Sequence, residues 1–303
     1  MLKDVCIIIL TYNNASDTLE CLQSVDKLVG GPYSVVLVDN GSTDGTIKRV
    51  SIAFPDVLII ENKINLGFAR GVNKGIIYAY AQGYQHFFLL NNDTVLDKQM
   101  MLEALEVERS DPNCGIVMPT ILKFPIQAAP FSRKLVWSDG GYQRHFPPTI
   151  KLKDDRLKTN PSTPRMIEFA PGCALLINRH TIDQVGLLDP EFFFFFEDWD
   201  YSIRVLNANL IIWNAPASIV WHKISQTARK NSNFYWKMMG RSSVYFFRKH
   251  FPITQTTLYI LVFFVRDFFL KPKKLTALLS FLSGLKSGIQ EAKIPIERTN
   301  ENV

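Results

Sequence analysis

Short apolar runs alternate with stretches of helical periodicity along the first half of the chain. The runs at 5–10, 34–38 and 87–90 are continuous and aliphatic or aromatic, which is typical of strands covered on both faces. Between them, apolar residues recur at helical spacing over 19–25 and from about 67 to 82. This alternation predicts an α/β fold with a mostly parallel, Rossmann-like sheet flanked by helices.

The second half of the chain is less regular. From about Lys123 to Arg165 the periodicity fades, and we expect a long loop that acts as a lid or binds an acceptor, with a small hairpin near 137–142. Strands and a short helix return over 167–213, and a C-terminal helical extension begins near Asn231. The predicted parts are 1–122, 123–230 and a basic, aromatic, helical tail at 231–303.

Composition places the chain among globular proteins. Its 303 residues, 47% of them apolar, are enough to bury one large α/β core or two smaller ones. The four cysteines have neither zinc-site nor disulfide spacing, which fits a reducing compartment. The amino terminus enters a strand without the regions of a secretory signal, so we expect a cytoplasmic protein.

Basic charge is concentrated late in the chain. The net charge is +6, yet residues 223–293 alone carry 13 basic against 2 acidic residues, which predicts a local anionic partner and argues against nucleic acid. Residues 251–265 are uncharged but too few to span a bilayer, which takes roughly 20 apolar residues. We therefore expect the tail to lie on the anionic inner face of the cell membrane. The alternative is that its aromatic residues cover the core or form a homodimer interface. The flanking cations are Arg241, Arg248, Lys249, Lys271, Lys273 and Lys274.

Polar residues follow three of the predicted strands, at Thr11, Asp39 and Asn91. The carboxyl ends of parallel strands lie along one edge of a sheet, where open α/β sheets bind ligands, so we expect a nucleotide cleft there. The run 91–93 places a carboxylate at this edge, suited to a divalent metal that holds a diphosphate. The alternative is an ordinary Asn/Asp turn. A second acidic cluster at 197–200, which closes another apolar run, favours the metal site.

Two common nucleotide-binding motifs are absent from the sequence. The first strand is not followed by G-x-G-x-x-G, and G-x-x-x-x-G-K-[ST] occurs nowhere, which argues against a Rossmann dehydrogenase or a P-loop enzyme. The glycines Gly67, Gly71 and Gly75 fall four apart, which favours close packing of a helix over a phosphate cradle.

Five blocks of polar and small residues lie between residues 4 and 225. They are Ile9-Leu10-Thr11-Tyr12-Asn13, Val38-Asp39-Asn40-Gly41-Ser42-Thr43-Asp44-Gly45, Asn65-Leu66-Gly67-Phe68-Ala69, Leu89-Leu90-Asn91-Asn92-Asp93-Thr94 and Glu197-Asp198-x-Asp200. In this order the blocks resemble the family 2 glycosyltransferases of the GT-A fold, and the rhamnosyltransferase-like branch most. Any one block is a weak signal, whereas five in register are highly specific.

The resemblance implies roles for residues at the predicted cleft. Asp39 would accept a hydrogen bond from a uracil or thymine ring, and its alternative role is a turn cap. Thr11, Tyr12 and Asn13 would line the same base pocket. Further candidates for donor binding are Gly67, Asn92, Gly172 and Glu197, of which Gly172 allows close backbone approach.

The candidate metal ligands implied by the resemblance are Asp93 and His222. The family carries an acidic metal-binding motif here, and this chain departs from a full Asp-x-Asp because Asn91 stands first. Mg²⁺ or Mn²⁺ accepts that departure, because substrate phosphates and water supply further ligands. The alternative for His222 is a hydrogen-bonded histidine at a strand end.

Asp198 is the candidate general base. Transfer with inversion needs one carboxylate that takes the proton of the acceptor hydroxyl, while the divalent ion stabilises the departing diphosphate. The apolar run 192–196 is expected to raise the pKa of a neighbouring carboxylate. The alternative is that the acidic cluster caps a helix. Cys173 is expected to be a packed thiol, because the sequence offers no activating base nearby.

The resemblance thus predicts an inverting, metal-dependent glycosyltransferase, in which 1–122 bind the nucleotide sugar and 123–230 bind the acceptor and catalyse transfer. The favoured donor is dTDP-rhamnose, and UDP-hexoses remain open. The acceptor would be a glycan or lipid-linked sugar of cell-surface polysaccharide synthesis. One rival is a sugar-nucleotide pyrophosphorylase, which would need a glycine-rich basic loop after the first strand; another is a noncatalytic, membrane-associated scaffold that binds nucleotide.

Overall fold

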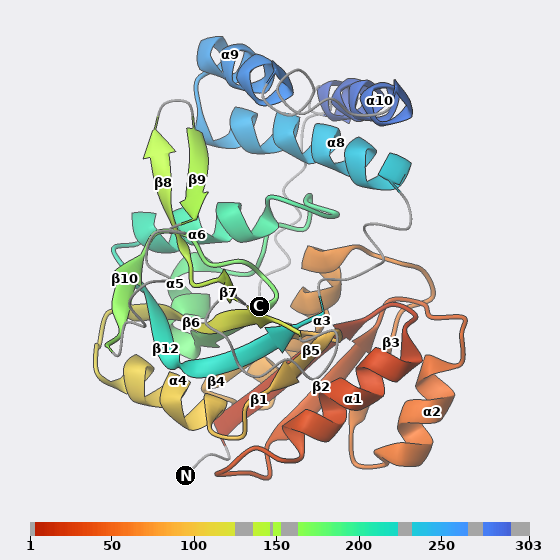
Figure 1. Ribbon diagram of the computed structural model, residues 1–303, viewed down its shortest axis with the longest axis vertical. Helices are drawn as coiled ribbons and strands as arrows, with labels where there is room; N and C mark the ends of the chain where they lie inside the picture. The colour runs from red at the N-terminus through yellow and green to blue at the C-terminus, as the bar shows by residue number, and fades with distance from the viewer. Residues whose placement is uncertain are drawn as a thin grey trace. The chain divides into compact units, whose positions relative to one another are not determined.

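Two compact units make up the chain (Figure 1). The computed structural model describes residues 4–124, 136–145, 148–152, 163–223, 232–265 and 275–291. The first unit comprises 1–143, 150–190 and 198–224, and the second comprises 144–149, 191–197 and 225–303.

One sheet forms the centre of the first unit. Its strands in chain order are β1 (Val5–Thr11), β2 (Ser34–Asp39), β3 (Leu58–Glu61), β4 (His86–Asn91), β5 (Thr94–Leu96), β6 (Cys114–Lys123), β7 (Val136–Ser138), β10 (Arg165–Ile167), β11 (Ala174–Asn178) and β12 (Ile211–His222). They lie in the order β10-β12-β6-β11-β4-β1-β2-β3, with β5 paired to β12 and β7 to β6. The pairings place β3, β2, β1, β4, β6 and β12 in one direction. The predicted mostly parallel sheet is therefore confirmed, with β11 running against both of its neighbours.

Helices cover both faces of this sheet. The helices of the first unit are α1 (Ala15–Val25), α2 (Thr46–Ala53), α3 (Phe68–Ala81), α4 (Met100–Arg109), α5 (Arg179–Val185) and α6 (Glu197–Asn207). Side chains alternate along β1, so Ile7 and Ile9 belong to the core under α1 and α4, whereas Cys6 and Ile8 belong to the core under α3 and α6. Both cores are closed, which is why β1 is apolar almost throughout.

The glycines of α3 allow the helix to lie close to the sheet. A Cβ on Gly75 would lie 2.4 Å from Cγ2 of Ile8, and a Cβ on Gly71 would lie 2.5 Å from Cδ1 of Leu10. The predicted packing role is therefore confirmed for these two glycines. Gly67 differs, because it precedes the helix as its N-cap with a φ of 82°.

The predicted hairpin near 137–142 is wrong. Strand β7 joins the sheet beside β6, while β8 (Gly141–His145) pairs with β9 (Pro148–Leu152). Gly140 lies between β7 and β8 with a φ of 92°, and the Arg165 guanidinium binds the carbonyl and carboxylate of Asp139. The chain changes direction here, so β7 and β8 pair with different strands and not with each other.

The second unit contains α8 (Ser232–His250), α9 (Ile253–Phe264) and α10 (Leu275–Glu291), so the predicted helical extension is confirmed. Helices α8 and α10 pack closely through glycine: a Cβ on Gly240 would lie 2.4 Å from the Phe281 carbonyl oxygen. In the part of the chain that the structure describes, no helix is long and apolar enough to cross a membrane. The predicted cations Lys271, Lys273 and Lys274 lie outside the described residues.

Candidate active site

Three strand ends meet at one edge of the sheet, as predicted. In the strand register Thr11 lies opposite Asp39, and Leu10 lies opposite Asn91. The Asn40 backbone N–H donates to the Thr11 carbonyl oxygen at 2.8 Å, so the chains leaving β1 and β2 start side by side. The loops that follow β1, β2 and β4 therefore begin next to one another at this edge of the sheet.

Hydrogen bonds join the loops after β1 and β2. The Asn13 N–H donates to Ser42 Oγ at 2.7 Å, and Thr43 N–H donates to Asn13 Oδ1 at 2.9 Å. Asn13 and Asn14 both adopt left-handed backbone conformations, which Asn tolerates better than most residues. Tyr12, which precedes them, is 41% exposed, so its side chain is accessible to a ligand.

Asp39 is a cap of the loop after β2. Its Oδ2 accepts hydrogen bonds from the N–H groups of Gly41 at 3.1 Å and Ser42 at 2.9 Å, and its Oδ1 accepts one from the Ser42 hydroxyl. The side chain is buried. The turn-cap alternative is thus present in the structure, and binding of a base by Asp39 stays a prediction.

An asparagine network, which the sequence analysis missed, fixes the loop before α3. Asn62 donates from Nδ2 to Asn40 Oδ1 at 3.0 Å, and Asn40 donates from Nδ2 to the Gly67 carbonyl oxygen at 2.9 Å. Asn65 accepts a hydrogen bond from the Gly67 N–H at 2.9 Å. Asn40 lies in the sequence block that contains Asp39, and Asn65 lies in the block that contains Gly67. The recurrence of Asn in these blocks was the sequence signal that could have predicted the network.

Asp93 and His222 form a buried pair. Strand β12 pairs with β5 so that His222 lies opposite Thr94, and the Lys223 N–H donates to the Asp93 carbonyl oxygen at 2.9 Å. His222 Nε2 lies 3.2 Å from Asp93 Oδ1, and both side chains are below 10% exposed. The Trp137 and His222 rings pack in a T-shaped arrangement at a centroid distance of 5.0 Å.

The unused polar atoms of this pair fit a divalent cation. Among the described residues, Asp93 Oδ2 and His222 Nδ1 are buried without a hydrogen-bond partner, which is costly unless a ligand takes them up. The described part of the chain holds no group of three or more His, Cys, Asp or Glu side chains arranged for a metal. Two protein ligands suit an ion whose remaining ligands come from phosphate and water.

Asn92 holds the strand ends together. Its Nδ2 donates to Thr11 Oγ1 at 3.1 Å and to Thr18 Oγ1 at 2.9 Å. Thr11 and Thr18 are both buried. The amide nitrogen of Asn92 therefore fixes the loop after β4 against β1 and α1, and a donor-binding role for this residue stays a prediction.

Asp198 lies in the first turn of α6 beside the Gly172 backbone. Its Oδ2 accepts a hydrogen bond from the Gly172 N–H at 3.2 Å, and its Oδ1 accepts one from the Trp199 N–H at 2.8 Å. Burial raises the pKa of Asp198 to about 6, against the lowering effect of these backbone hydrogen bonds. The pKa of Asp198 is thus raised by burial, and a part played by the 192–196 run in that rise stays a prediction. Glu197 precedes Asp198 and is buried; its role as a donor ligand stays a prediction.

Gly172 and Cys173 connect the two carboxylates. The Cys173 carbonyl oxygen accepts a hydrogen bond from the Asn91 N–H at 3.0 Å, and a Cβ on Gly172 would lie 3.5 Å from Cβ of Asp198. Burial, followed by the charges of Asp93 and Asp198, holds the pKa of the Cys173 thiol well above its usual range. The prediction that Cys173 is a packed thiol is confirmed.

The arrangement of sheet and helices is that of the GT-A fold. GalNAc-T7, solved with UDP, GalNAc and Mn²⁺, superposes with a TM-score of 0.57 at 16% identity, covering 89% of this chain and 59% of that chain. The mannosyltransferase PcManGT from Pyrobaculum calidifontis, solved with GDP-Man and Mn²⁺, superposes with a TM-score of 0.58 at 14% identity, covering 97% and 77%. The GT-A fold prediction is therefore confirmed.

The sequence places the chain in one family within this class. Residues 6–185 match glycosyl transferase family 2, and the chain belongs to that family. The low-salt glycan biosynthesis hexosyltransferase Agl10 of Haloferax volcanii is 25% identical over 96% of this chain and 92% of its own length. The N-acetylglucosaminyl-diphospho-decaprenol L-rhamnosyltransferase of Mycobacterium tuberculosis is 27% identical over 74% of this chain and 77% of its own length. The protein is thus a glycosyltransferase of an inverting family, and the predicted enzyme class is confirmed.

Proposed function

We propose that this protein transfers a sugar from a nucleotide-diphosphate donor to a lipid-linked acceptor, with Asp198 as general base. The observation that carries this proposal is that Gly172 and Cys173 connect two residues: Cys173 binds the strand end before Asp93, whose Oδ2 is unpartnered, and Gly172 binds Asp198, whose pKa is raised. A general base works best when its pKa lies near the working pH. The ordinary Asp value of 3.8 would leave a much weaker base than the value of about 6 found for Asp198.

The role of Asp198 is to take the proton of the acceptor hydroxyl. The oxygen of that hydroxyl forms the new bond to the anomeric carbon, and the bond to the nucleotide diphosphate breaks on the opposite side. The backbone N–H groups of Gly172 and Trp199 fix both carboxylate oxygens, so the base is oriented before the substrates bind. The absence of a side chain at Gly172 lets its backbone lie close to Asp198, because a Cβ there would lie 3.3 Å from the Phe68 ring and 3.5 Å from the Asp198 Cβ.

Asp93 and His222 are the proposed ligands of Mg²⁺ or Mn²⁺. Their buried, unpartnered oxygen and nitrogen atoms match the donor types that these ions accept. A bound ion at this place supplies positive charge that stabilises the diphosphate as it departs. Both structural neighbours were solved with Mn²⁺, which supports a divalent ion here without distinguishing Mn²⁺ from Mg²⁺.

The proposed donor site lies at the ends of β1 and β2. The exposed Tyr12 ring offers a stacking surface for a base, and the hydrogen-bonded loops at Asn13 and Asp39 give that surface a fixed backbone. Gly67 follows in the same asparagine network. We propose a pyrimidine nucleotide, with dTDP-rhamnose and UDP-hexoses as the donors to test. The name of the mycobacterial relative includes a rhamnosyl group and a diphospho-decaprenol, which supports rhamnose as the sugar and a lipid-linked acceptor.

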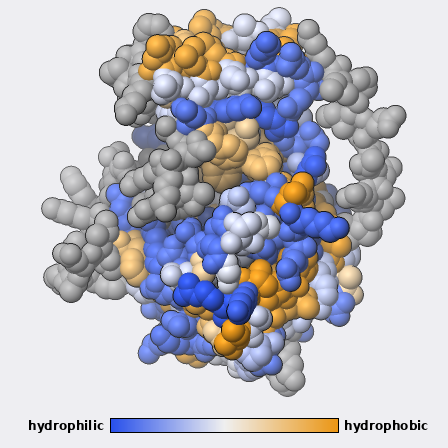
Figure 2. Space-filling view, turned by 90° about the vertical axis from the view of Figure 1, so that its right-hand side faces the viewer, coloured by the Kyte–Doolittle hydropathy of each residue, from blue (hydrophilic) through white to orange (hydrophobic). Residues whose placement is uncertain are grey.

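We propose the anionic inner membrane surface as the partner of the second unit. Helix α10 exposes an apolar row at intervals of three, four and seven residues, and α9 exposes a second row. The opposite side of α10, with Phe281 and Gly284, faces α8. Figure 2 shows apolar side chains gathered at the top of the view, where Figure 1 places α9 and α10. The rows are Leu275, Leu279, Leu282 and Ile289 on α10, and Leu258 and Leu261 on α9, with Val265 directly after α9. Such rows bind a bilayer interface when basic residues flank them.

A transfer assay tests the proposed function. The protein, Mn²⁺ and a radiolabelled nucleotide sugar are incubated with polyprenyl-diphosphate-linked N-acetylglucosamine, and the lipid fraction is counted. We expect label from one pyrimidine sugar, an inverted anomeric configuration by NMR, and no transfer after EDTA treatment. Label from purine donors alone would contradict the donor proposal. If the protein binds the nucleotide sugar but neither hydrolyses it nor transfers the sugar to any acceptor, the noncatalytic scaffold would be favoured over the enzyme.

A further inference from the structure

Lys223 directly follows the proposed metal ligand His222. Both the backbone N–H and the side-chain ammonium group of Lys223 have partners. Its backbone N–H donates to the Asp93 carbonyl oxygen at 2.9 Å. Its Nζ lies 2.6 Å from Asp17 Oδ1 and 2.5 Å from Glu20 Oε2. One residue therefore connects the end of β12 to the loop after β4 and, through its side chain, to α1.

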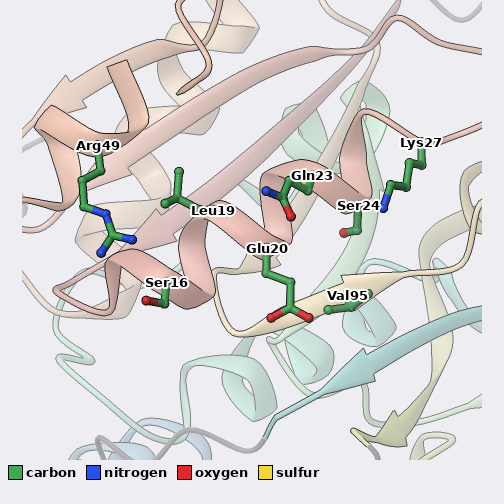
Figure 3. A pocket seen from close by; sticks show the side chains of 8 residues that line it. All are labelled: Ser16, Leu19, Glu20, Gln23, Ser24, Lys27, Arg49 and Val95. Atoms are coloured by element: carbon green, nitrogen blue, oxygen red, sulfur yellow. The ribbon is translucent and has the colours of Figure 1, made fainter. Parts of the chain in front are cut away.

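The two acidic partners are placed for this contact by helix geometry. Asp17 and Glu20 are three residues apart on α1, so their side chains project from the same face of the helix. Figure 3 shows the Glu20 carboxylate, from the middle of α1, beside Val95 of β5. Glu20 and Val95 also line a shallow polar pocket there. The acidic pair lies more than 200 residues before Lys223 in the sequence, so only the fold brings them together.

The ammonium group is held firmly. Its side chain is 21% exposed, and the side chains of Asp17 and Glu20 are 31% and 43% exposed. Burial lowers the pKa of Lys223, but the hydrogen bonds and charges of Asp17 and Glu20 outweigh it, so the net pKa is raised. The Phe124 ring lies 5.3 Å from Nζ, and the Phe124 N–H donates to the His222 carbonyl oxygen at 3.0 Å.

The imidazole of His222 has few fixed contacts of its own. Within the described chain its ring nitrogens lack a hydrogen-bond partner, although Nε2 lies 3.2 Å from Asp93 Oδ1. Metal-binding histidines are usually oriented by a second hydrogen bond from the other ring nitrogen. Here the orientation must come from the backbone on either side of His222 and from the Trp137 ring.

We propose that the ion-pair clamp of Lys223 with Asp17 and Glu20 is a positioning device that holds His222 against Asp93. The inference rests on the proposed function, because it assigns the clamp to the metal site. The clamp fixes the last residues of β12 against α1, and α1 is itself tied to the loop after β4 through Thr18 and Asn92. Its removal lets the end of β12 move, and the two ligands separate.

The experiment compares Lys223→Met with Lys223→Arg, with the Asp17→Asn/Glu20→Gln variant, and with Lys27→Met, just after the end of α1, as a matched control. Hydrogen–deuterium exchange of the metal-free protein reads the clamp directly. We expect faster exchange at residues 219–223 in Lys223→Met and in the double acid variant, and wild-type exchange in Lys27→Met. Lys223→Arg should restore protection, because it keeps the ion pairs.

The second measurement is Mn²⁺ affinity, from the EPR signal of free Mn²⁺ in the presence of UDP. Outer contacts to metal ligands typically change affinity about 10- to 100-fold, and a partly exposed ion pair acts more weakly, so we expect a loss of about three- to tenfold. Faster exchange with unchanged Mn²⁺ affinity would overturn the positioning role. Unchanged exchange would overturn the clamp itself. The Asp93→Asn variant distinguishes failure of the metal site from failure of the Lys223 proposal. If this variant binds Mn²⁺ as the wild type does, the proposed metal site is wrong, independently of the results for Lys223.

Discussion

Replacing Asp198 with Asn should abolish sugar transfer and leave donor binding unchanged. Asn has the same shape, and its Oδ1 can still accept a hydrogen bond from Gly172 or Trp199, whose N–H groups lie 3.2 Å and 2.8 Å from the carboxylate. It cannot take a proton from a hydroxyl. General-base catalysis typically contributes about 10²- to 10⁴-fold, so kcat should fall by at least about a hundredfold. Asp56→Asn, at an exposed site, is the matched control.

The dependence of the transfer rate on pH tests the role of Asp198 quantitatively. Burial raises the pKa of Asp198 from 3.8 to about 6, and the base must be deprotonated to act. Transfer should therefore be near its plateau at pH 7.5 and fall as pH drops through about 6. At pH 5 it should reach about one-tenth of the plateau, whereas a base with an ordinary pKa would retain about nine-tenths. Initial rates of kcat/KM between pH 4.5 and 8, with radiolabelled donor, measure this limb.

The same pKa change has an effect of opposite sign on stability. Because the folded-state pKa lies above the unfolded value, the favourable contribution of Asp198 is complete below pH 3.8 and is lost as pH rises through about 6. At pH 7.5 the charged group destabilises the fold by at most about 3 kcal/mol, less where water reaches it. Asp198→Asn should therefore unfold at a higher temperature than wild type at pH 7.5, and at the same temperature near pH 4. Retained turnover in this variant, or an acid limb near pH 4, would refute the role given to Asp198.

Three further predictions concern packing, the thiol and the tail. Gly75→Ala should lower the free energy of unfolding by about 1–2 kcal/mol in urea, because overpacking costs more than the gain in helix propensity; an unchanged midpoint would contradict the close packing of α3. Cys173→Ala should keep at least half of wild-type kcat in the transfer assay, because the thiol is packed and protonated, and loss of turnover with donor binding intact would make it a reacting group. Leu279→Glu/Leu282→Glu should reduce sedimentation with anionic phosphatidylglycerol vesicles several-fold, while Ile52→Glu, at an exposed apolar site on α2, should not; equal sedimentation of all forms would remove α10 from membrane binding.

The strand-end geometry was predictable because parallel strands follow simple rules. Thr11, Asp39 and Asn91 each close an apolar run, and parallel pairing brings the ends of such runs to one edge. Asp93 and Asp198 could be nominated from the same reasoning together with the family resemblance. The apolar run before Asp198 suggested a raised pKa, whereas the burial that causes the rise could be read only from the structure.

Contacts between distant residues could not be predicted in this way. Lys223 meets Asp17 and Glu20 only because β12 ends beside α1, and nothing in the local sequence marks that meeting. The hairpin near 137–142 was wrong for a related reason. Strand β7 is too short for its sequence pattern to predict its partner strand. In the structure it pairs with the end of β6.

The central claim is that a metal site at Asp93 and a base at Asp198 serve the same sugar carbon. A crystal structure of Asp198→Asn with Mn²⁺ and the intact donor tests it most directly. We predict Mn²⁺ on the Asp93 carboxylate and His222, with the residue 198 side chain facing the anomeric carbon from the side opposite the diphosphate. A donor whose anomeric carbon faces away from residue 198, or a metal bound without Asp93, would contradict the claim.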